Sequence, residues 1–262
     1  MDWGMANRMS KIIKPKTGRT VMLAVDHGYF MGPTTGLENL KKTVDPLIPY
    51  ADTLMLTRGA LRNYINPDVD IPIVLRVSGG TSILNKNMLH EGIVASIEEA
   101  IRLNVAGVAF SIMVGSEMER DTILAFTEMI DEAQLYGIPV VAVTAVGKEM
   151  VRDARYMSLA SRIAAELGAQ IVKTYYVDGF EQVVQTCPVP IVIAGGKKLP
   201  ELDALKMASS AIKAGAVGVD MGRNIFQSDD PVAMIKAVRA VVHEGASPKE
   251  AFAQFSKAKK RR

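Results

Sequence analysis

The chain has 262 residues, which suits one α/β barrel of roughly 250 residues or two smaller domains. Hydrophobic residues make up 48% of it and charged residues 23%, and no apolar run reaches the ~18 residues of a membrane-spanning helix, which excludes a disordered chain and a membrane protein. The net charge of +3 is misleading, because five of the positive charges lie in the last six residues. The rest of the chain has 26 basic and 28 acidic residues, which excludes the basic surface of a nucleic-acid binder.

Short apolar segments rich in β-branched residues recur along the chain, and each ends in glycine or a polar residue. Most are hydrophobic at nearly every position, as in IPIVL and VPIVIA, which is typical of strands covered on both faces. The eight segments are Val21–Gly28, Thr53–Gly59, Ile71–Gly80, Gly107–Gly115, Ile138–Gly147, Gln170–Tyr176, Val189–Gly196 and Ala216–Arg223. They predict eight parallel strands.

Segments with helical periodicity separate these strands. They include Glu91–Leu103, Glu119–Tyr136, Arg155–Leu167, Leu202–Ala214 and Pro231–His243. Alternating strands and helices predict a (β/α)8 TIM barrel formed by a single domain over residues 1–262, with an N-terminal helical segment at 1–20 and a C-terminal helix and basic tail at 245–262. A doubly wound open sheet is the alternative, but DHGY follows the first strand where a GxGxxG loop would stand.

Lys173 is the strongest single signal for chemistry. It lies inside QIVKTYY, an otherwise largely apolar strand. Fully buried lysines are rare unless paired, and loss of water favours the neutral amine, which attacks a ketone to form a Schiff base. The alternative is a lysine that forms an ion pair with an acid from a neighbouring strand, and position alone does not decide between the two.

Asp26 and His27 end the first predicted strand, where reactive residues of a barrel are expected. The carboxylate of Asp26 accepts or delivers protons or orients the lysine, and the alternative is a cap on the following loop. For His27, a functional and a packing role both remain open. Three scattered histidines and a single cysteine, Cys187, provide neither a zinc ligand set nor a disulfide, so we expect no bound metal.

The last two strands carry a second signal. Gly195 and Gly196 follow the seventh strand, and Gly222 and Arg223 follow the eighth. The loops after these two strands form the recurrent phosphate site of this fold, where glycine lets backbone N–H groups approach the phosphate and arginine binds it through two N–H groups. The sequence therefore predicts a phosphate site, although glycines needed only for tight turns are the alternative.

Four further residues are candidates to line the site: Arg58, Ser78, Thr144 and Tyr175. Turn chemistry explains Arg58 and Ser78 equally well. Cys187 precedes the seventh strand, at the far face of the barrel, and is not expected to be a nucleophile. The N-terminus has an early acid and no apolar signal-peptide core, so we expect a cytoplasmic protein.

Four motifs resemble the archaeal-type class I aldolase family of lysine-dependent barrels. They are AVDHG at 24–28, IVKTYY at 171–176, IAGGKK at 193–198 and MGRNIFQ at 221–227. The resemblance implies a Schiff base on Lys173, an acid/base role for Asp26 and a phosphate site in the two glycine loops.

Further segments, at 1–5, 27–38, 146–156 and 230–238, are similar to the branch of the family that transfers an acyl group to coenzyme A during degradation of a phosphorylated quorum-sensing signal. Relatives usually have residues before the first of these segments, which implies a shorter N-terminus here. The resemblance implies a small phosphorylated ketone as substrate, coenzyme A as co-substrate, no bound cofactor and a homo-oligomer, a decamer. His27 is then a candidate base for the thiol.

One departure from the family pattern bears on the reaction. The aldolases carry a tyrosine acid at the end of the fifth strand, where this chain has TAVG at 144–147. A class I aldolase acting on a ketose phosphate such as fructose 1,6-bisphosphate is therefore the second expectation. A barrel that binds a phosphorylated metabolite without catalysis is the third. The buried lysine favours an enzyme, because phosphate binding does not require it.

Overall fold

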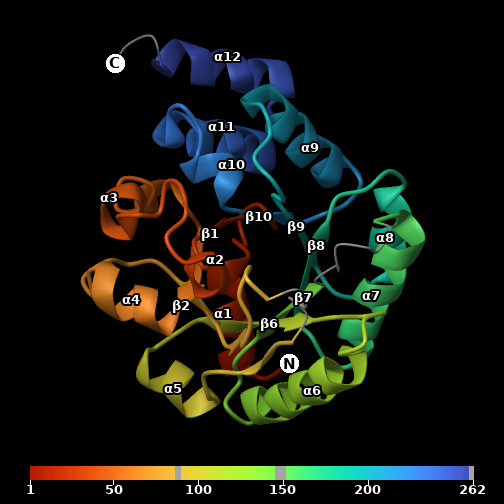
Figure 1. The fold of residues 1–262 in the computed structure, drawn as a ribbon. Coiled ribbons are helices and arrows are strands. Elements are labelled where there is room, and N and C mark those ends of the chain that lie inside the picture. The colour runs from red at the N-terminus through yellow and green to blue at the C-terminus, as the bar shows by residue number, and fades with distance from the viewer. Residues whose placement is uncertain (86–89, 145–151, 260–262) are drawn as a thin grey trace.

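The computed structural model describes residues 1–85, 90–144 and 152–259 (Figure 1). Eight parallel strands close into a barrel in the order β1-β10-β9-β8-β7-β6-β3-β2. Their bounds are β1 Thr20–Ala24, β2 Thr53–Thr57, β3 Ile73–Arg76, β6 Gly107–Ile112, β7 Val140–Thr144, β8 Ile171–Tyr175, β9 Ile191–Ala194 and β10 Gly218–Met221. Each predicted segment contains one of them, except that β1 begins one residue before its segment, at Thr20, so the (β/α)8 barrel is confirmed.

Helices surround the barrel (Figure 1). They are α1 Trp3–Ile12, α2 Gly28–Met31, α3 Leu40–Val44, η1 Ile48–Tyr50, α4 Arg58–Tyr64, α5 Ile97–Arg102, α6 Glu119–Leu135, α7 Ala154–Glu166, α8 Phe180–Thr186, α9 Glu201–Lys213, α10 Arg223–Phe226, α11 Pro231–Glu244 and α12 Pro248–Lys259. Among the described residues, none of these helices is long and apolar enough to cross a membrane.

The predicted helix over 91–103 is wrong in its first half. Gly92–Ile93 forms β5, which pairs antiparallel with β4, Ser78–Gly79, in a small separate sheet. The helix begins only at Ile97, because the hydroxyl of Ser96 accepts a hydrogen bond from the Glu99 N–H and caps the first turn.

The barrel interior changes character along its axis. A buried apolar cluster fills the N-terminal half and includes Met22, Met55 and Val74. Helix α1 closes this end, because Ile12 is fully buried in the same cluster. Side chains two residues apart on a strand point to the same face, so the next inward position after Val74 on β3 is Arg76. The interior is therefore apolar at the N-terminal end and charged at the C-terminal end.

Candidate active site

Lys173 lies inside the C-terminal half of the barrel, because it follows the inward-facing Ile171 by two residues on β8. Its side chain is 9% exposed, and its Nζ lies 2.9 Å from Oδ2 of Asp220 on β10, which is 0% exposed. Strand β9 separates the two strands, so barrel closure brings the charges together. The two features that the sequence left open, a desolvated lysine and an acidic partner, are both present.

Asp220 is the acid that the sequence did not reveal. Burial raises its pKa above the ordinary range, and the positive charge of Lys173 opposes that rise without cancelling it. Among the described residues, Oδ1 of Asp220 has no hydrogen-bond partner. The carboxyl group therefore has a free oxygen, and it accepts a proton more readily than an exposed aspartate does.

Asp26 follows β1 and binds a second buried cation. Nε of Arg76 lies 2.9 Å from its Oδ2, and both side chains are buried. Burial acts to raise the pKa of Asp26, but the positive charges of Arg76 and Lys173 outweigh it and hold the pKa below the ordinary value. Asp26 is therefore a carboxylate at neutral pH. Its pKa is lowered, whereas the pKa of Asp220 is raised.

A chain of hydrogen bonds fixes Arg76. Its Nη1 donates to Ser111 Oγ at 2.7 Å and to Ser78 Oγ at 3.4 Å. The hydroxyl of Ser78 donates to Glu91 at 2.7 Å, and the phenol of Tyr29 donates to the other oxygen of the same carboxylate at 2.7 Å. Burial raises the pKa of Tyr29, so the phenol remains protonated. Glu91, directly before β5, is thus tied to β4 through Ser78 and to α2 through Tyr29.

His27 lies beside Asp26, with its Nδ1 4.0 Å from Oδ1 of the carboxylate. Burial lowers the pKa of His27 to about 4, so the ring is neutral at neutral pH. Its Nδ1 is buried and has no hydrogen-bond partner among the described residues. Gly222 packs directly against this ring: a Cβ there would overlap His27 and the Ala24 carbonyl oxygen. Glycine at 222 therefore allows the ends of β1 and β10 to approach.

Asn224 joins the two predicted phosphate loops. Its Nδ2 donates to the carbonyl oxygens of Gly195, at 2.6 Å, and Lys197, at 3.2 Å, while its Oδ1 accepts from the N–H of Leu199 at 2.7 Å. The loop after β9 is thereby fastened to the start of α10.

The glycine loops and Arg223 meet at the ends of β9 and β10. Gly196 has a φ of +66°, in the left-handed region, and an added Cβ there would meet open space. Nε of Arg223 is buried and has no hydrogen-bond partner within the described part of the chain. A buried guanidinium N–H without a partner is suited to an anionic ligand.

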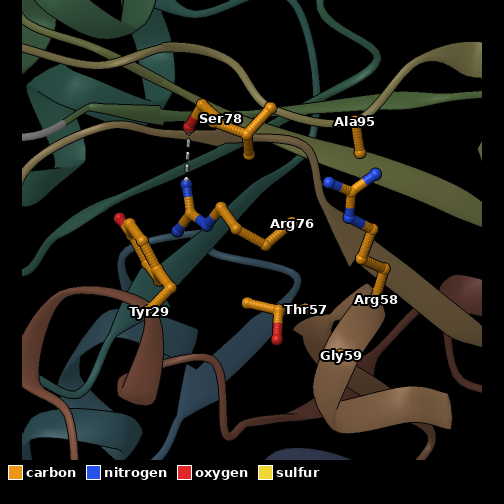
Figure 2. A pocket seen from close by; sticks show the side chains of 8 residues that line it. Tyr29, Thr57, Arg58, Gly59, Arg76, Ser78 and Ala95 are labelled. Carbon is orange, nitrogen blue, oxygen red and sulfur yellow. Dashed lines mark hydrogen bonds between the residues drawn. The ribbon is translucent and has the colours of Figure 1, made fainter.

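A hollow of about 230 Å³ opens at the ends of β2 and β3 (Figure 2). The sequence candidates Arg58 and Ser78 both line it, together with Tyr29, Thr57, Gly59, Arg76, Val94 and Ala95. Arg58 is exposed and has no acid within ion-pairing distance among the described residues.

Thr144 and Tyr175 point to opposite faces of the barrel wall. The hydroxyl of Thr144 donates to Thr174 Oγ1 at 2.8 Å, and Thr174 in turn contacts Met157 of α7, so Thr144 faces the helix layer and not the interior. Tyr175 is half-buried on the same face of β8 as Lys173, with the guanidinium of Arg152 4.1 Å from its ring centroid. Residues 145–147, in the segment compared with the aldolase tyrosine, lie outside the described residues.

Two observations concern metals and thiols. In the described ranges, no group of three or more His, Cys, Asp or Glu side chains is placed to hold a metal ion. Cys187 is buried after α8, at the start of β9, and burial raises the pKa of its thiol. It therefore lies at the end of the barrel opposite Lys173, as the sequence predicts.

Comparisons with known proteins place these features in a family. A sequence model described as DeoC/LacD family aldolase matches residues 20–228. The chain belongs to this family. It is therefore an enzyme of the class I aldolase type, as its motifs predicted.

Two relatives carry the same name, 3-hydroxy-5-phosphonooxypentane-2,4-dione thiolase. The one from Photorhabdus laumondii is 57% identical and covers 97% of this chain and 88% of its own length. The one from an Enterobacter species is 58% identical over 96% and 85%. Among solved structures, an archaeal fructose-1,6-bisphosphate aldolase with its catalytic lysine bound to the carbinolamine intermediate is 26% identical, with a TM-score of 0.82 over 91% of this chain and 99% of that one.

Proposed function

We propose that this member of the family is a thiolase that forms a Schiff base with 3-hydroxy-5-phosphonooxypentane-2,4-dione. It uses coenzyme A to cleave this substrate into acetyl-coenzyme A and dihydroxyacetone phosphate, in the breakdown of phosphorylated autoinducer-2. The names of the relatives at 57 and 58% identity support the substrate. The observation that carries the chemistry is the buried Lys173–Asp220 pair at the barrel mouth. Coenzyme A is a co-substrate, and no bound cofactor is needed.

The first step makes the imine. The neutral amine of Lys173 attacks the ketone carbon beside the phosphorylated methylene group, and water leaves to give a protonated imine. Asp220 assists, because it lies 2.9 Å from Nζ and burial raises its pKa, so it takes the proton that the ammonium must lose.

The second step breaks a carbon–carbon bond. The sulfur of coenzyme A attacks the acetyl carbonyl carbon, and the resulting tetrahedral intermediate expels the neighbouring hydroxyl-bearing carbon. The electron pair of the broken bond moves into the protonated imine, which becomes a neutral enamine. The acetyl group leaves on sulfur as acetyl-coenzyme A.

One proton then passes from the thiol to the enamine carbon. Asp26 suits this transfer, because its lowered pKa keeps it a carboxylate that first accepts the proton and then returns it. His27 is a neutral ring with an unpartnered Nδ1 4.0 Å from that carboxylate, and we assign it the relay from the thiol. Hydrolysis of the imine then releases dihydroxyacetone phosphate and restores the lysine.

The phosphate group anchors the substrate at the loops after β9 and β10. We assign this role to Gly195, Gly196, Gly222 and Arg223. The unpartnered, buried Nε of Arg223 and the open left-handed backbone at Gly196 support it.

Aldol cleavage of a ketose phosphate is the second candidate, and the similarity to the archaeal fructose-1,6-bisphosphate aldolase supports it. It needs an acid or base at the hydroxyl of the departing aldehyde. Thr144 faces the helix layer, and TAVG at 144–147 contains no tyrosine. The thiolase reaction needs no such phenol, because its leaving acyl group is captured by sulfur.

Borohydride trapping tests the proposal. Reduction in the presence of substrate is expected to attach a three-carbon phosphate to Lys173, detected by peptide mass analysis. Lys173→Ala should lose both the adduct and turnover, whereas Lys206→Ala, which removes a surface amine, should keep both. An unmodified Lys173 would reject the mechanism, and product formation independent of coenzyme A would assign the chain as an aldolase.

We further propose that the enzyme acts in the cytoplasm as a homo-oligomer, a decamer by its resemblance to the family. Two large apolar side chains, Trp3 at 81% and Leu135 at 80% exposure, support a contact between copies. Light scattering at several protein concentrations tests this, and a monomer at all of them would contradict it.

A further inference from the structure

We infer that the hollow at the ends of β2 and β3 receives the thiol end of coenzyme A, and that Arg58 stabilises the thiolate there. This inference rests on the proposed function and adds the place where the second substrate binds. The hollow is lined by residues that the imine chemistry on Lys173 does not use, above all Thr57, Arg58 and Val94.

The hollow lies on the side of the barrel mouth opposite β8 and β9. In the closed strand order, β3 stands four strands from β9 in either direction, and β2 stands four strands from β8. The hollow is therefore across the mouth from the loop after β9 and from Lys173, whereas the loop after β10 is only two strands from β2. A substrate held by its phosphate near the loop after β9 and by its ketone at Lys173 can extend its acyl end toward the wall formed by β2 and β3.

Arg76 on that wall has a guanidinium N–H group that is not used in hydrogen bonding among the described residues. Its Nε and Nη1 are held by Asp26 and Ser111, but no residue of the described part accepts a hydrogen bond from Nη2. Figure 2 shows this guanidinium beside Tyr29 and Ser78, at the edge of the hollow. A carbonyl oxygen placed there would gain negative charge when sulfur attacks, and a fixed N–H donor stabilises such an oxygen.

Arg58 brings a positive charge to the hollow. Its side chain extends along the hollow toward Ala95, as Figure 2 shows. No acid of the described residues forms a salt bridge with it, and Glu99, whose pKa the charge of Arg58 helps to lower, is bonded to Arg62 and Arg102 instead. A cation beside a thiol lowers the pKa of the thiol and raises the fraction of the reactive thiolate. The hollow thus has a group that activates the nucleophile and one that receives the developing oxyanion.

The volume of the hollow limits which part of coenzyme A fits inside it. The hollow has a volume of about 230 Å³. This is below the roughly 300–1,000 Å³ of pockets that bury a drug-sized ligand, so the hollow suits the thiol and the short chain that carries it rather than the whole of coenzyme A. We therefore place the sulfur of coenzyme A, and not its phosphates, beside Arg58.

The experiment compares coenzyme A with N-acetylcysteamine, which has the same thiol end and no phosphate. Arg58→Gln is expected to lower kcat/KM about tenfold for both thiols at neutral pH, and to move the ascending limb of the pH profile to higher pH by about one unit. Arg58→Lys should retain most activity. Arg120→Gln, which removes an exposed arginine from the start of α6, is the matched control and should change nothing. Val94→Phe, which narrows the hollow, should raise KM for both thiols.

Other kinetic results would contradict either this inference or the proposed function. A loss with coenzyme A but not with N-acetylcysteamine would place Arg58 on the phosphates and overturn the inference, as would unchanged kinetics with both. Borohydride trapping with dihydroxyacetone phosphate needs no thiol and should label Lys173 equally in wild type and Arg58→Gln. Failure of that labelling in the wild type refutes the proposed function, whereas normal labelling with unaltered thiol kinetics refutes this inference alone.

Discussion

Replacing Lys173 by methionine should destabilise the fold as well as abolish catalysis. The substitution leaves the carboxyl group of Asp220, which is 0% exposed, without the cation 2.9 Å away. Removal of one partner of a buried ion pair costs about 3–5 kcal/mol, because the remaining charge keeps its desolvation penalty. In a domain of this size, each kcal/mol lowers Tm by about 2–4 °C, so we expect a fall of roughly 10 °C at neutral pH.

The pH dependence identifies the cause. The folded-state pKa of Asp220 is raised by burial, so the carboxyl favours folding when it is protonated and loses that contribution as pH rises above the ordinary value of 3.8. Lys173→Met should therefore be most destabilised near pH 8 and recover toward pH 5. Urea unfolding at several pH values, with turnover measured in parallel, tests this expectation.

Two controls separate the pair from general damage. Lys206→Met removes a surface lysine and should change the free energy of unfolding by less than about 0.5 kcal/mol. The double variant Lys173→Met, Asp220→Leu removes both charges and should regain most of the lost stability while remaining inactive. A single variant as stable as the wild type at pH 8 would refute the buried pair.

Three further predictions concern other parts of the barrel. Gly222→Ala should destabilise by about 1–3 kcal/mol in urea unfolding and weaken substrate binding, because the added Cβ overlaps His27. Asn224→Ala should raise KM for the phosphorylated substrate at least about tenfold, since the glycine loop loses its hydrogen bonds; steady-state kinetics measures this. Burial acts to raise the pKa of Asp52, but hydrogen bonds from His243 and Arg239 outweigh burial, so the pKa is below the ordinary value. Asp52→Asn should therefore reduce the free energy of unfolding at pH 7. This loss should shrink as pH falls below about 3.8, because the wild-type carboxylate is then protonated too.

Sequence patterns predicted the barrel because its strands are covered on both faces and so appear as continuous apolar runs. Short elements escaped prediction: α4 has seven residues and follows β2 directly, so its helical periodicity is too brief to separate from the strand end. The β4–β5 pair depends on a contact between residues 78–79 and 92–93, which no local pattern reveals.

The site was predictable where a charge interrupts an apolar strand. That signal identified Lys173, and the same signal is present at Arg76 in IPIVLRV and at Asp220 in VGVDMG. What the sequence could not supply is which charges meet. Lys173 pairs with Asp220 across an intervening strand, and Asp26 pairs with Arg76 from two strands away, because barrel closure and register set these distances.

The two ion pairs also explain how the site tolerates the charge changes of the reaction. Lys173 and Asp220 form one neutral pair, and Arg76 and Asp26 form the other. A protonated imine keeps the positive charge beside Asp220, so the balance survives the first step. The enamine is neutral, and it would leave Asp220 as an unpaired buried anion. Because burial already raises the pKa of this carboxyl, it can hold the thiol proton that Asp26 accepts until that proton reaches the enamine carbon. Asp26 passes this proton on, because the positive charges of Arg76 and Lys173 hold its pKa below the ordinary value. The carboxyl of Asp220 is thus the one expected to change protonation state in step with the lysine.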